Sequence, residues 1–359
     1  MSASGDTVST LRVVIIGGGI AGVSAAAALA PHCEVTLLEQ ETSFGYHASG
    51  RSAAMFEENY GNDAVRALNR ASKAEHERLN VLSPRGLMMV ALEGEREAFE
   101  ADLDTMGMRE ISVAEARRMV PILGPDIVRA GLNEGASDID TDRLLNAYAR
   151  EARSHEAELS AGAEVVGIDR GRSWQVRTTS GGFEADIIVN AAGAWADQVA
   201  NMANVRCVGL QPYRRSMARL PAPGGHDVRG WPMLFGPGES WYAKPDAGAW
   251  IVSPAEEDPV EPMDAWADDM VLAEGLARYE AHVSEPVTRV QTNLAGLRTF
   301  APDRSLVIGE APDAPGFFWL AGQGGYGFQT APAAADLLAA LVLSQTSVLA
   351  GAVVDALSP

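Results

Sequence analysis

Basic residues and cysteines are both scarce in this 359-residue chain, and each shortage excludes a class of protein. Its 28 lysines and arginines are outnumbered by 48 acidic residues, which gives a formal net charge of −20. A surface of that sign repels phosphate backbones and anionic lipids, so we expect no nucleic-acid or membrane-surface partner. The two cysteines, Cys33 and Cys207, form neither a CxxC pair nor a zinc-ligand spacing, which favours reduced thiols in a reducing compartment.

Long hydrophobic runs are also missing. The first ten residues are small and polar, and the apolar run 11–16 is too short for a signal-peptide core. No stretch approaches the roughly 20 apolar residues of a membrane span. The nearest, 331–343, is interrupted by Asp336 and is typical of a buried helix. We therefore expect a cytoplasmic protein, long enough for two domains.

The sequence does contain strand–turn–helix units. Residues 11–16 are continuous and β-branched, as in a strand buried on both faces. A glycine turn at 17–22 follows, then an alanine-rich helix over 23–30 and a second strand that ends at Glu39. This order is typical of a parallel sheet in an α/β protein.

The composition changes in the middle of the chain. Residues 213–262 are rich in proline, glycine and tryptophan, which indicates a separate, β-rich insertion. We therefore predict an α/β protein with a Rossmann-like nucleotide-binding domain assembled from three segments and interrupted by a substrate domain. The predicted segments are 8–84, 140–212 and 296–359 for the first domain, and 85–139 and 213–295 for the second.

The glycine turn is the main binding motif. Gly17 allows a tight turn, Gly19 lets the backbone approach a pyrophosphate, and Gly22 lets the helix pack closely on the strand. The helix N-terminus attracts phosphate. Glu39, at the end of the second strand, is placed to accept hydrogen bonds from ribose hydroxyls. A glycine turn without a ligand is the alternative, and the strand–turn–helix setting disfavours it.

Three further small-residue segments favour FAD over NAD. Residues 190–195 form a second turn after a buried strand, and 45–52 is a small polar loop just after Glu39. Residues 322–327 open another helix, whose N-terminus would stabilise negative charge on a reduced flavin. Each alone is compatible with an ordinary loop, and an NAD-dependent dehydrogenase remains an alternative. Neither cysteine has a recognised flavin-attachment context, so we expect a non-covalent cofactor.

A set of short motifs runs from about residue 11 to 335. They are Gly17–Gly22, Glu39, Tyr46–Ala54, Tyr60–Gly61, Asp138–Asp142, Val189–Trp195, Gly209–Pro212, Arg214–Ser216, Trp231–Leu234, Tyr242–Gly248, Gly296–Arg298 and Gly324–Thr330. Together they resemble the D-amino acid oxidase superfamily, most closely the D-arginine dehydrogenase type of D-amino acid dehydrogenase. The resemblance implies a substrate domain with a mixed β-sheet. It also implies FAD-dependent oxidation of a D-amino acid to an imino acid, which water converts to a 2-oxo acid and ammonia.

The resemblance also implies which residues contact cofactor and substrate. The FAD contacts would be Gly17, Gly19, Ala21, Gly22, Glu39, Gln40, Ala48, Ser49, Gly50, Arg51, Ser52, Ala53, Val165, Gly324, Gly325, Tyr326, Gly327, Phe328 and Gln329. The catalytic set would be Arg298, Arg215, Tyr60, Tyr242 and Gln329. The two guanidinium groups would bind the substrate carboxylate, for which a bidentate fork is suited.

The chain departs from the D-arginine branch at the side-chain pocket. Leu87 follows Ser-Pro-Arg-Gly where the branch has an acid, Met55 replaces a histidine, and Phe235 replaces a smaller residue near Met233. Such a pocket predicts a neutral, apolar or aromatic side chain, because an unpaired cation there loses its hydration. Glu57 is the nearby acid that would rescue a basic substrate.

The sequence is also compatible with other functions. One is oxidation of a secondary amine or imino acid, such as sarcosine, an opine or proline. Another is a non-catalytic or partner-dependent flavoprotein. The motifs are shared by oxidases and dehydrogenases, so oxygen or a quinone-type carrier is the expected electron acceptor.

Overall fold

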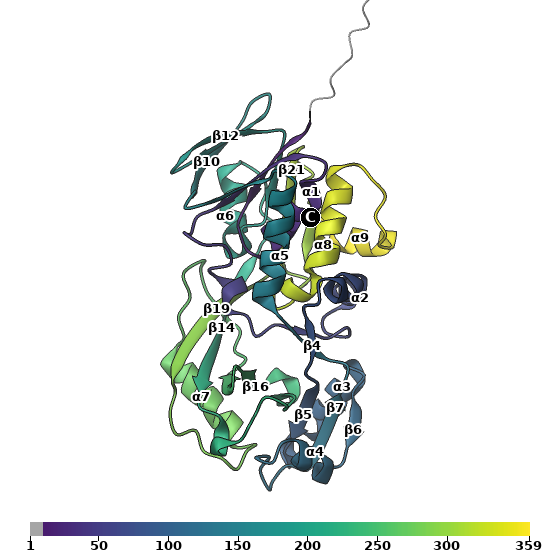
Figure 1. Ribbon diagram of the computed structural model, residues 1–359, viewed down its shortest axis with the longest axis vertical. Helices are drawn as coiled ribbons and strands as arrows, with labels where there is room; N and C mark the ends of the chain where they lie inside the picture. The colour runs from purple at the N-terminus through teal and green to yellow at the C-terminus, as the bar shows by residue number, and fades with distance from the viewer. Residues whose placement is uncertain (1–9) are drawn as a thin grey trace, which may run out of the picture. The chain divides into compact units, whose positions relative to one another are not determined.

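The computed structural model describes residues 10–359, which divide into two compact units (Figure 1). The first comprises the chain up to Ser49, Asp142–Leu210 and the chain from Phe300 onward. The second comprises Gly50–Thr141 and Gln211–Thr299, so residues 50–84 fall in the second unit, whereas the sequence-based boundaries assign them to the first domain. The start predicted at residue 8 and most of the polar N-terminal stretch lie outside the described residues.

The first unit is built on a six-stranded sheet. Its order is β20 (Val307–Glu310), β21 (Phe317–Ala321), β13 (Ile187–Asn190), β1 (Arg12–Ile16), β2 (Glu34–Glu39) and β9 (Glu158–Ala161). All neighbours pair in parallel except β20, which runs antiparallel to β21. An antiparallel three-stranded sheet, β10 (Val165–Arg170), β11 (Trp174–Thr178) and β12 (Gly181–Ala185), completes its strands. The predicted α/β class is confirmed.

Helices of the first unit pack through small residues. They are α1 (Ile20–Leu29), α5 (Thr141–Ser154), α6 (Ala196–Met202), α8 (Gly327–Val342) and α9 (Gly351–Leu357). The alanine-rich α1 is buried along nearly its whole length and lies beside α8 (Figure 1). Small side chains allow two helices to approach closely, and this brings the N-termini of both helices to one edge of the sheet. The apolar run predicted as a buried helix forms most of α8.

The second unit contains the larger, mixed sheet. It is made of β18 (Asp258–Pro259), β14 (Gln211–Leu220), β17 (Ala249–Ser253), β16 (Tyr242–Asp246), β15 (Met233–Phe235), β5 (Leu87–Ala91), β7 (Arg129–Asn133) and β6 (Arg109–Ile111), with β19 (Thr292–Phe300) paired to β14. Strands β15 and β5 are parallel, while β15 with β16 and β5 with β7 are antiparallel. A small antiparallel sheet consists of β3 (Met55–Phe56), β8 (Ser137–Ile139) and β4 (Leu82–Pro84).

Strand periodicity separates the two faces of this large sheet. Trp250, Ala243 and Leu234 pack into one apolar core with helices α4 (Val113–Met119) and α7 (Asp269–Glu280) nearby. Their chain neighbours Tyr242 and Phe235 belong to a different cluster, because successive side chains of a strand point to opposite faces. Helices α2 (Asp63–Arg78) and α3 (Arg96–Thr105) complete the second unit.

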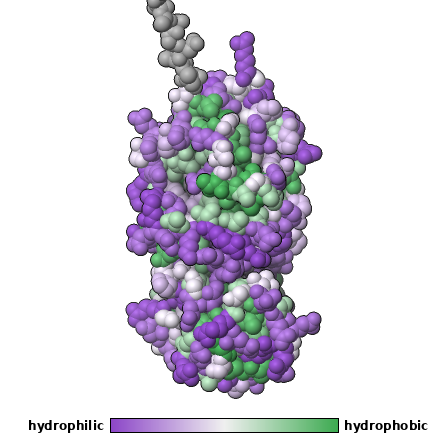
Figure 2. Space-filling view, turned by 90° about the vertical axis from the view of Figure 1, so that its right-hand side faces the viewer, coloured by the Kyte–Doolittle hydropathy of each residue, from purple (hydrophilic) through white to green (hydrophobic). Residues whose placement is uncertain are grey.

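The surface drawn in Figure 2 is mostly hydrophilic, as the many charged residues of the sequence lead us to expect. On the face drawn in Figure 2, hydrophilic residues cover most of the surface and apolar residues form separate patches among them. Across residues 10–359, no helix has both the length and the apolar character needed to cross a bilayer.

Candidate cofactor and substrate sites

The glycine turn between β1 and α1 leaves no space for a side chain at Gly17 or at Gly22. Gly17 has a φ of +108°, and a Cβ there would lie 2.4 Å from the Ala191 carbonyl oxygen. A Cβ on Gly22 would lie 1.9 Å from the Gly17 oxygen. At Gly19 the nearest atom is Ser49 Oγ, at 3.2 Å. The first and third glycines thus serve close packing, and the middle one keeps the backbone accessible to a phosphate group.

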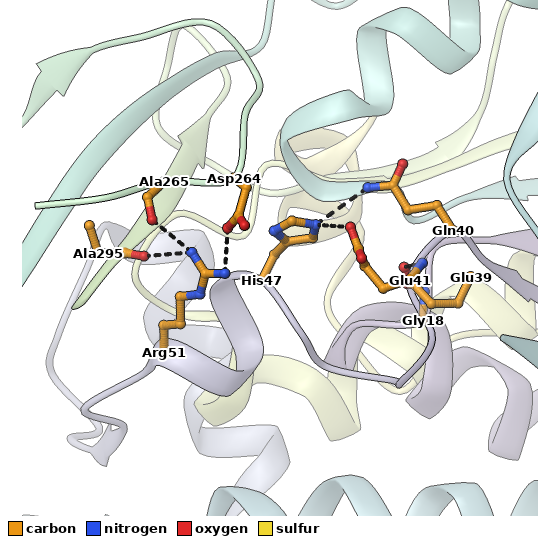
Figure 3. A network of polar contacts seen from close by, with 9 residues as sticks. All are labelled: Gly18, Glu39, Gln40, Glu41, His47, Arg51, Asp264, Ala265 and Ala295. Atoms are coloured by element: carbon orange, nitrogen blue, oxygen red, sulfur yellow. Dashed lines mark hydrogen bonds and ion pairs between the residues drawn. The ribbon is translucent and has the colours of Figure 1, made fainter. Parts of the chain in front are cut away.

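Glu39 ends β2 next to this turn (Figure 3). Its buried carboxylate accepts hydrogen bonds from the Gly18 N–H at 2.6 Å and from the Glu41 N–H at 2.8 Å. A carboxylate has about four lone-pair directions, so it retains capacity to accept from ribose hydroxyls. Beside it, His47 Nε2 lies 2.9 Å from Glu41 Oε1 and 3.4 Å from Gln40 Nε2.

The other small-residue segments meet the same turn. Ser49 Oγ accepts from the Ile20 N–H at 3.0 Å, and the Gly45 N–H donates to the Gly18 oxygen at 3.0 Å. Gly327, the first residue of α8, lies close to Ile20, and Ala191 follows β13 beside Gly17. Three separate loops therefore surround one glycine turn at the carboxyl edge of a parallel sheet, an arrangement that fits a dinucleotide with its pyrophosphate at two helix N-termini.

The predicted cofactor residues are divided between the two units. Ala48 to Arg51 form a short 3-10 turn, and Gly50, Arg51, Ser52 and Ala53 belong to the second unit. The Arg51 guanidinium donates to the Ala265 and Ala295 carbonyls at 2.9 and 3.0 Å and pairs with Asp264 at 2.5 Å (Figure 3). The Arg51 guanidinium is thus bound by residues of the second unit, to which Arg51 itself belongs. Within the first unit, Ala21 and Gly22 are the second and third residues of α1, Gln40 follows β2, Val165 begins β10, Gly324, Gly325 and Tyr326 precede α8, and Phe328 and Gln329 are buried in α8.

The predicted catalytic arginines and tyrosines of the second unit form one cluster. Arg215 lies on β14 and Arg298 on the paired strand β19, while Tyr242 begins β16 and Tyr60 follows β3. Arg298 is hydrogen-bonded to Tyr60, and its charge interacts with Tyr242 and Arg215. Two guanidinium groups and two phenols from four distant segments therefore gather at one place, a donor set suited to a carboxylate.

The electrostatics of this cluster favour an anion. Burial and the neighbouring Arg298 charge lower the pKa of Arg215, whose side chain is 5% exposed. Burial also acts against the Arg298 charge, but the phenols and the Glu239 carboxylate outweigh it and raise the pKa of Arg298. Arg215 Nη2 pairs with Glu257 at 3.1 Å, while its buried Nε and Nη1 have no hydrogen-bond acceptor among the described residues. An incoming carboxylate would supply one.

The residues predicted to contact the substrate side chain also lie together. Leu87, Phe235 and Tyr242 are members of one apolar cluster, against which Met55 and Met233 pack. Strand register explains this: Met233 pairs with Leu87, and Phe235 pairs with both Met89 and Tyr242.

Glu57 is buried at the edge of the small sheet. Its carboxylate accepts from the Asn59 N–H at 3.0 Å and from Asn133 Nδ2, and burial raises the pKa of this carboxyl group. Asn133 pairs with Leu87, so Glu57 lies beside the same face of the sheet. Both carboxylate oxygens are engaged by protein donors, which makes Glu57 a weak partner for a cationic substrate.

Sequence reasoning missed the charged residues that support the cluster. Glu239, in the turn between β15 and β16, accepts from the Tyr60 hydroxyl at 3.1 Å, and Glu257 holds Arg215. Lys244 and Asp138 occur in the recognised motifs, but the motifs alone assign them no role. Only the positive φ of Glu239, +51°, distinguishes it locally, and backbone angles cannot be read from a sequence.

The parallel sheet and its glycine cradle indicate a dinucleotide-binding protein. The chain belongs to the FAD-dependent oxidoreductase (DAO) family, whose model matches residues 12–341, and FAD is its cofactor. The resemblance to the D-amino acid oxidase superfamily is thereby confirmed. The finer assignment to the D-arginine dehydrogenase branch stays a prediction.

Similar proteins share the fold over nearly the full chain. Glycine oxidase of Pseudomonas aeruginosa is 26% identical over 363 residues, covering 94% of this chain and 96% of the relative. The structures of glycine oxidase from Geobacillus kaustophilus and of iminodiacetate oxidase from Chelativorans sp. BNC1 both superpose with a TM-score of 0.82 at 23% identity. They cover 97% of this chain and 98% and 99% of the other chains, respectively. For three other curated relatives, the match spans only 64%, 48% and 25% of their lengths.

Proposed function

We propose that this protein oxidises a small amine that carries a carboxylate on the neighbouring carbon. The observation that supports this most directly is the cluster of Arg215, Arg298, Tyr60 and Tyr242 in the second unit, with two guanidinium donors of Arg215 left for an external acceptor. A buried, unused charge-assisted donor is costly unless a ligand completes it. Membership of an FAD-dependent oxidoreductase family supplies the redox chemistry.

The chain's own residues bind and orient the substrate. Arg298 and Arg215 hold the carboxylate, and the Tyr242 hydroxyl donates to the carboxylate or contacts the amine. Tyr60 donates its hydroxyl to Glu239 and is hydrogen-bonded to Arg298, so it positions that arginine. With the carboxylate fixed, rotation about one bond remains, and the pocket wall sets it so that the Cα–H bond has a single direction. The two-electron oxidation itself would be supplied by FAD, which the residues of the glycine turn would hold. The amine must first lose a proton, and we propose Tyr60 or a water molecule as the acceptor.

The first candidate substrate is a D-amino acid with a non-cationic side chain. The resemblance to D-amino acid dehydrogenases supports the chirality, and the apolar cluster of Leu87, Met55, Met233 and Phe235 supports the side-chain preference. Burying an unpaired cation against such a surface costs several kcal/mol, on the order of 2 or more. The immediate product would be an imino acid, which water hydrolyses to a 2-oxo acid and ammonia.

The second candidate is a secondary amine or imino acid. Proteins that are similar over the full chain include glycine oxidases and an iminodiacetate oxidase, whose names denote small amino carboxylates with little or no side chain. The same carboxylate cluster would serve sarcosine-like compounds, because both kinds of substrate carry the same carboxylate next to the amine-bearing carbon. The two candidates therefore differ in where the substituent lies: on the amine-bearing carbon in a D-amino acid, and on the nitrogen in a compound such as sarcosine.

Anaerobic mixing of the yellow holoprotein with a substrate panel tests the proposal. The panel is the D- and L-forms of alanine, leucine and arginine, with D-proline, sarcosine and the hydroxy acid lactate. We expect flavin absorbance to bleach with at least one amine and not with lactate, and D-leucine to react faster than D-arginine. A protein that no amine bleaches would be a non-catalytic or partner-dependent flavoprotein, and the proposal would be wrong. Reoxidation by oxygen or by a soluble quinone then identifies the acceptor.

A further inference from the structure

Lysine is nearly absent from this chain, and one of its two lysines is buried. The 28 basic residues comprise 26 arginines and only Lys73 and Lys244. Lys73 is half-exposed on α2 and pairs with Glu58. Lys244, on β16, has a side chain that is only 10% exposed. An ammonium in that position needs a specific reason, because a buried charge is costly unless its donors are used.

Lys244 belongs to an ionic triad with an excess of one positive charge. Its Nζ lies 2.5 Å from Asp138 Oδ1, and the Arg85 guanidinium lies 2.7 Å from Asp138 Oδ2. One carboxylate thus serves two cations. Arg85 uses its remaining donors on the carbonyls of Arg229 and Trp231, at 2.7 and 2.9 Å. One positive charge of the triad is therefore uncompensated, and it is shared between Arg85 and Lys244.

The Lys244 ammonium group has one N–H donor without an acceptor among residues 10–359. A lysine has three N–H donors. Asp138 accepts one, and the Ala53 carbonyl, 3.5 Å away, is at the limit of hydrogen bonding. Residues 10–359 offer Nζ no third acceptor. Because the group is nine-tenths buried, bulk water cannot hydrate this donor freely.

Strand register places Lys244 on the substrate face of the large sheet. Tyr242 and Lys244 are two residues apart on β16, so their side chains point to the same face. The ladder that pairs Phe235 with Tyr242 brings Met233 beside Lys244, and Met233 in turn pairs with Leu87. Lys244 therefore projects from the face that carries the residues predicted to contact the substrate side chain, and its Cα lies about 7 Å along the strand from that of Tyr242.

We propose that Lys244 is a specificity-determining residue that binds a second carboxylate of the substrate. This inference rests on the proposed function and narrows it: the first carboxylate goes to the Arg215–Arg298 cluster, the apolar cluster contacts the carbon chain, and Lys244 binds the distal anion. The substrate class is then an amino dicarboxylate, either a primary amine such as D-aspartate or D-glutamate or a secondary amine such as iminodiacetate. The excess positive charge at the same point excludes cationic side chains.

Substrate selectivity of three variants tests this assignment. The measurement is the ratio of kcat/KM for D-aspartate to that for D-leucine, and for iminodiacetate to that for N-ethylglycine. We expect Lys244→Met to lower the ratio at least about tenfold, the effect of one charge-assisted hydrogen bond. Lys244→Arg should restore part of it, and Lys73→Met should leave it unchanged. An unchanged ratio in Lys244→Met overturns the proposal.

A binding measurement on the wild-type holoprotein needs neither turnover nor a stable variant. Succinate and butyrate have the same carbon chain and differ by one carboxylate, and each is titrated while the flavin absorbance spectrum is followed. We expect succinate to bind about tenfold more tightly, with a difference that shrinks at high salt. Equal or weaker binding of succinate overturns the role of Lys244. If D-leucine or sarcosine bleaches the flavin while dicarboxylates neither bind nor react, this inference fails and the proposed function stands. If no amine bleaches it, the proposed function fails, and the succinate titration alone decides the role of Lys244.

Discussion

The cofactor cradle is formed mainly by backbone groups, whereas the carboxylate cluster is formed by side chains. The cradle uses backbone N–H groups and the absence of side chains, as at Gly17 and Gly22, where a single Cβ would collide with a carbonyl oxygen. The cluster uses long side chains, Arg215 and Arg298, delivered by two paired strands of the other unit. A backbone site tolerates almost no change, whereas a side-chain site loses its contacts one at a time. The two regions should therefore respond differently to substitution.

The largest effect is expected in the cradle. Gly22→Ala would place a methyl group 1.9 Å from the Gly17 oxygen, in the turn that would receive the pyrophosphate. Because the obstructing atom belongs to the backbone, relief requires the turn itself to move. We expect the purified variant to lack FAD, measured as loss of flavin absorbance relative to protein absorbance.

The matched control for this substitution is Gly351→Ala. Gly351 begins α9 in the same unit, and a methyl group added there would point into open space, with no packed atom within 4 Å. This variant should retain full flavin content. Normal flavin content in Gly22→Ala would show that the turn does not hold the cofactor.

The next largest effect is expected at Arg298. Arg298→Met keeps much of the length of the side chain and removes the charge that lies among Tyr60, Tyr242 and Glu239. Loss of one partner of a buried charge pair costs about 2–5 kcal/mol, or roughly 30- to several-thousand-fold in kcat/KM. Flavin content should stay normal, because the substitution leaves the first unit intact. Steady-state kinetics with the best amine of the panel measures the loss, and a change below about threefold, under 1 kcal/mol, would remove Arg298 from the site.

Adjacent arginines on β14 provide a sharper comparison. Arg215 and Arg214 point to opposite faces of the strand: Arg215 interacts with Arg298, while Arg214 pairs with Asp258 at 2.8 Å. Arg215→Met should raise KM about 10- to 100-fold, the value of one charge-assisted hydrogen bond. Arg214→Met should leave KM within about twofold. Equal effects of the two would mean that strand direction, and with it the assignment of the substrate face, is wrong.

The contrast between the regions also explains what the sequence could predict. Gly17 to Gly22 and Glu39 form a local pattern in which spacing alone carries the geometry, so the nucleotide fold was evident without any relative. The cluster has no such local pattern. Arg298 and Tyr60 are separated by more than 200 residues, and only the pairing of strands brings them together. The family resemblance predicted that Arg298 and Tyr60 lie in one site. The hydrophobic periodicity of the sequence carries no information about that contact.

Residues that act through charge balance were the hardest to predict. Glu239 and Glu257 lie in connecting segments, 179 and 42 residues in sequence from their partners Tyr60 and Arg215. Lys244 and Asp138 belong to different sheets. A sequence gives their charges but not the distances between them, and those distances decide whether a lysine is a surface residue or a buried cation.

The smallest effect is expected at Glu57, beside the same substrate face. Burial raises the pKa of its carboxyl group above the ordinary value of 4.5, so the folded state binds this proton more tightly than the unfolded state. As pH rises from 4.5 through the raised value, the group ionises at a cost in the folded state, and the free energy of unfolding falls. One full unit of pKa difference would correspond to about 1.4 kcal/mol, which sets the scale of the effect.

Glu57→Gln should therefore flatten the fall in stability over this pH range, measured by urea unfolding at a series of pH values. Glu134→Gln, an exposed site in the same unit, makes the same change in net charge and should leave the profile parallel to wild type. Parallel profiles for all three proteins would mean that the Glu57 carboxylate is as well solvated as one on the surface, and that the face beside Leu87 is open to water.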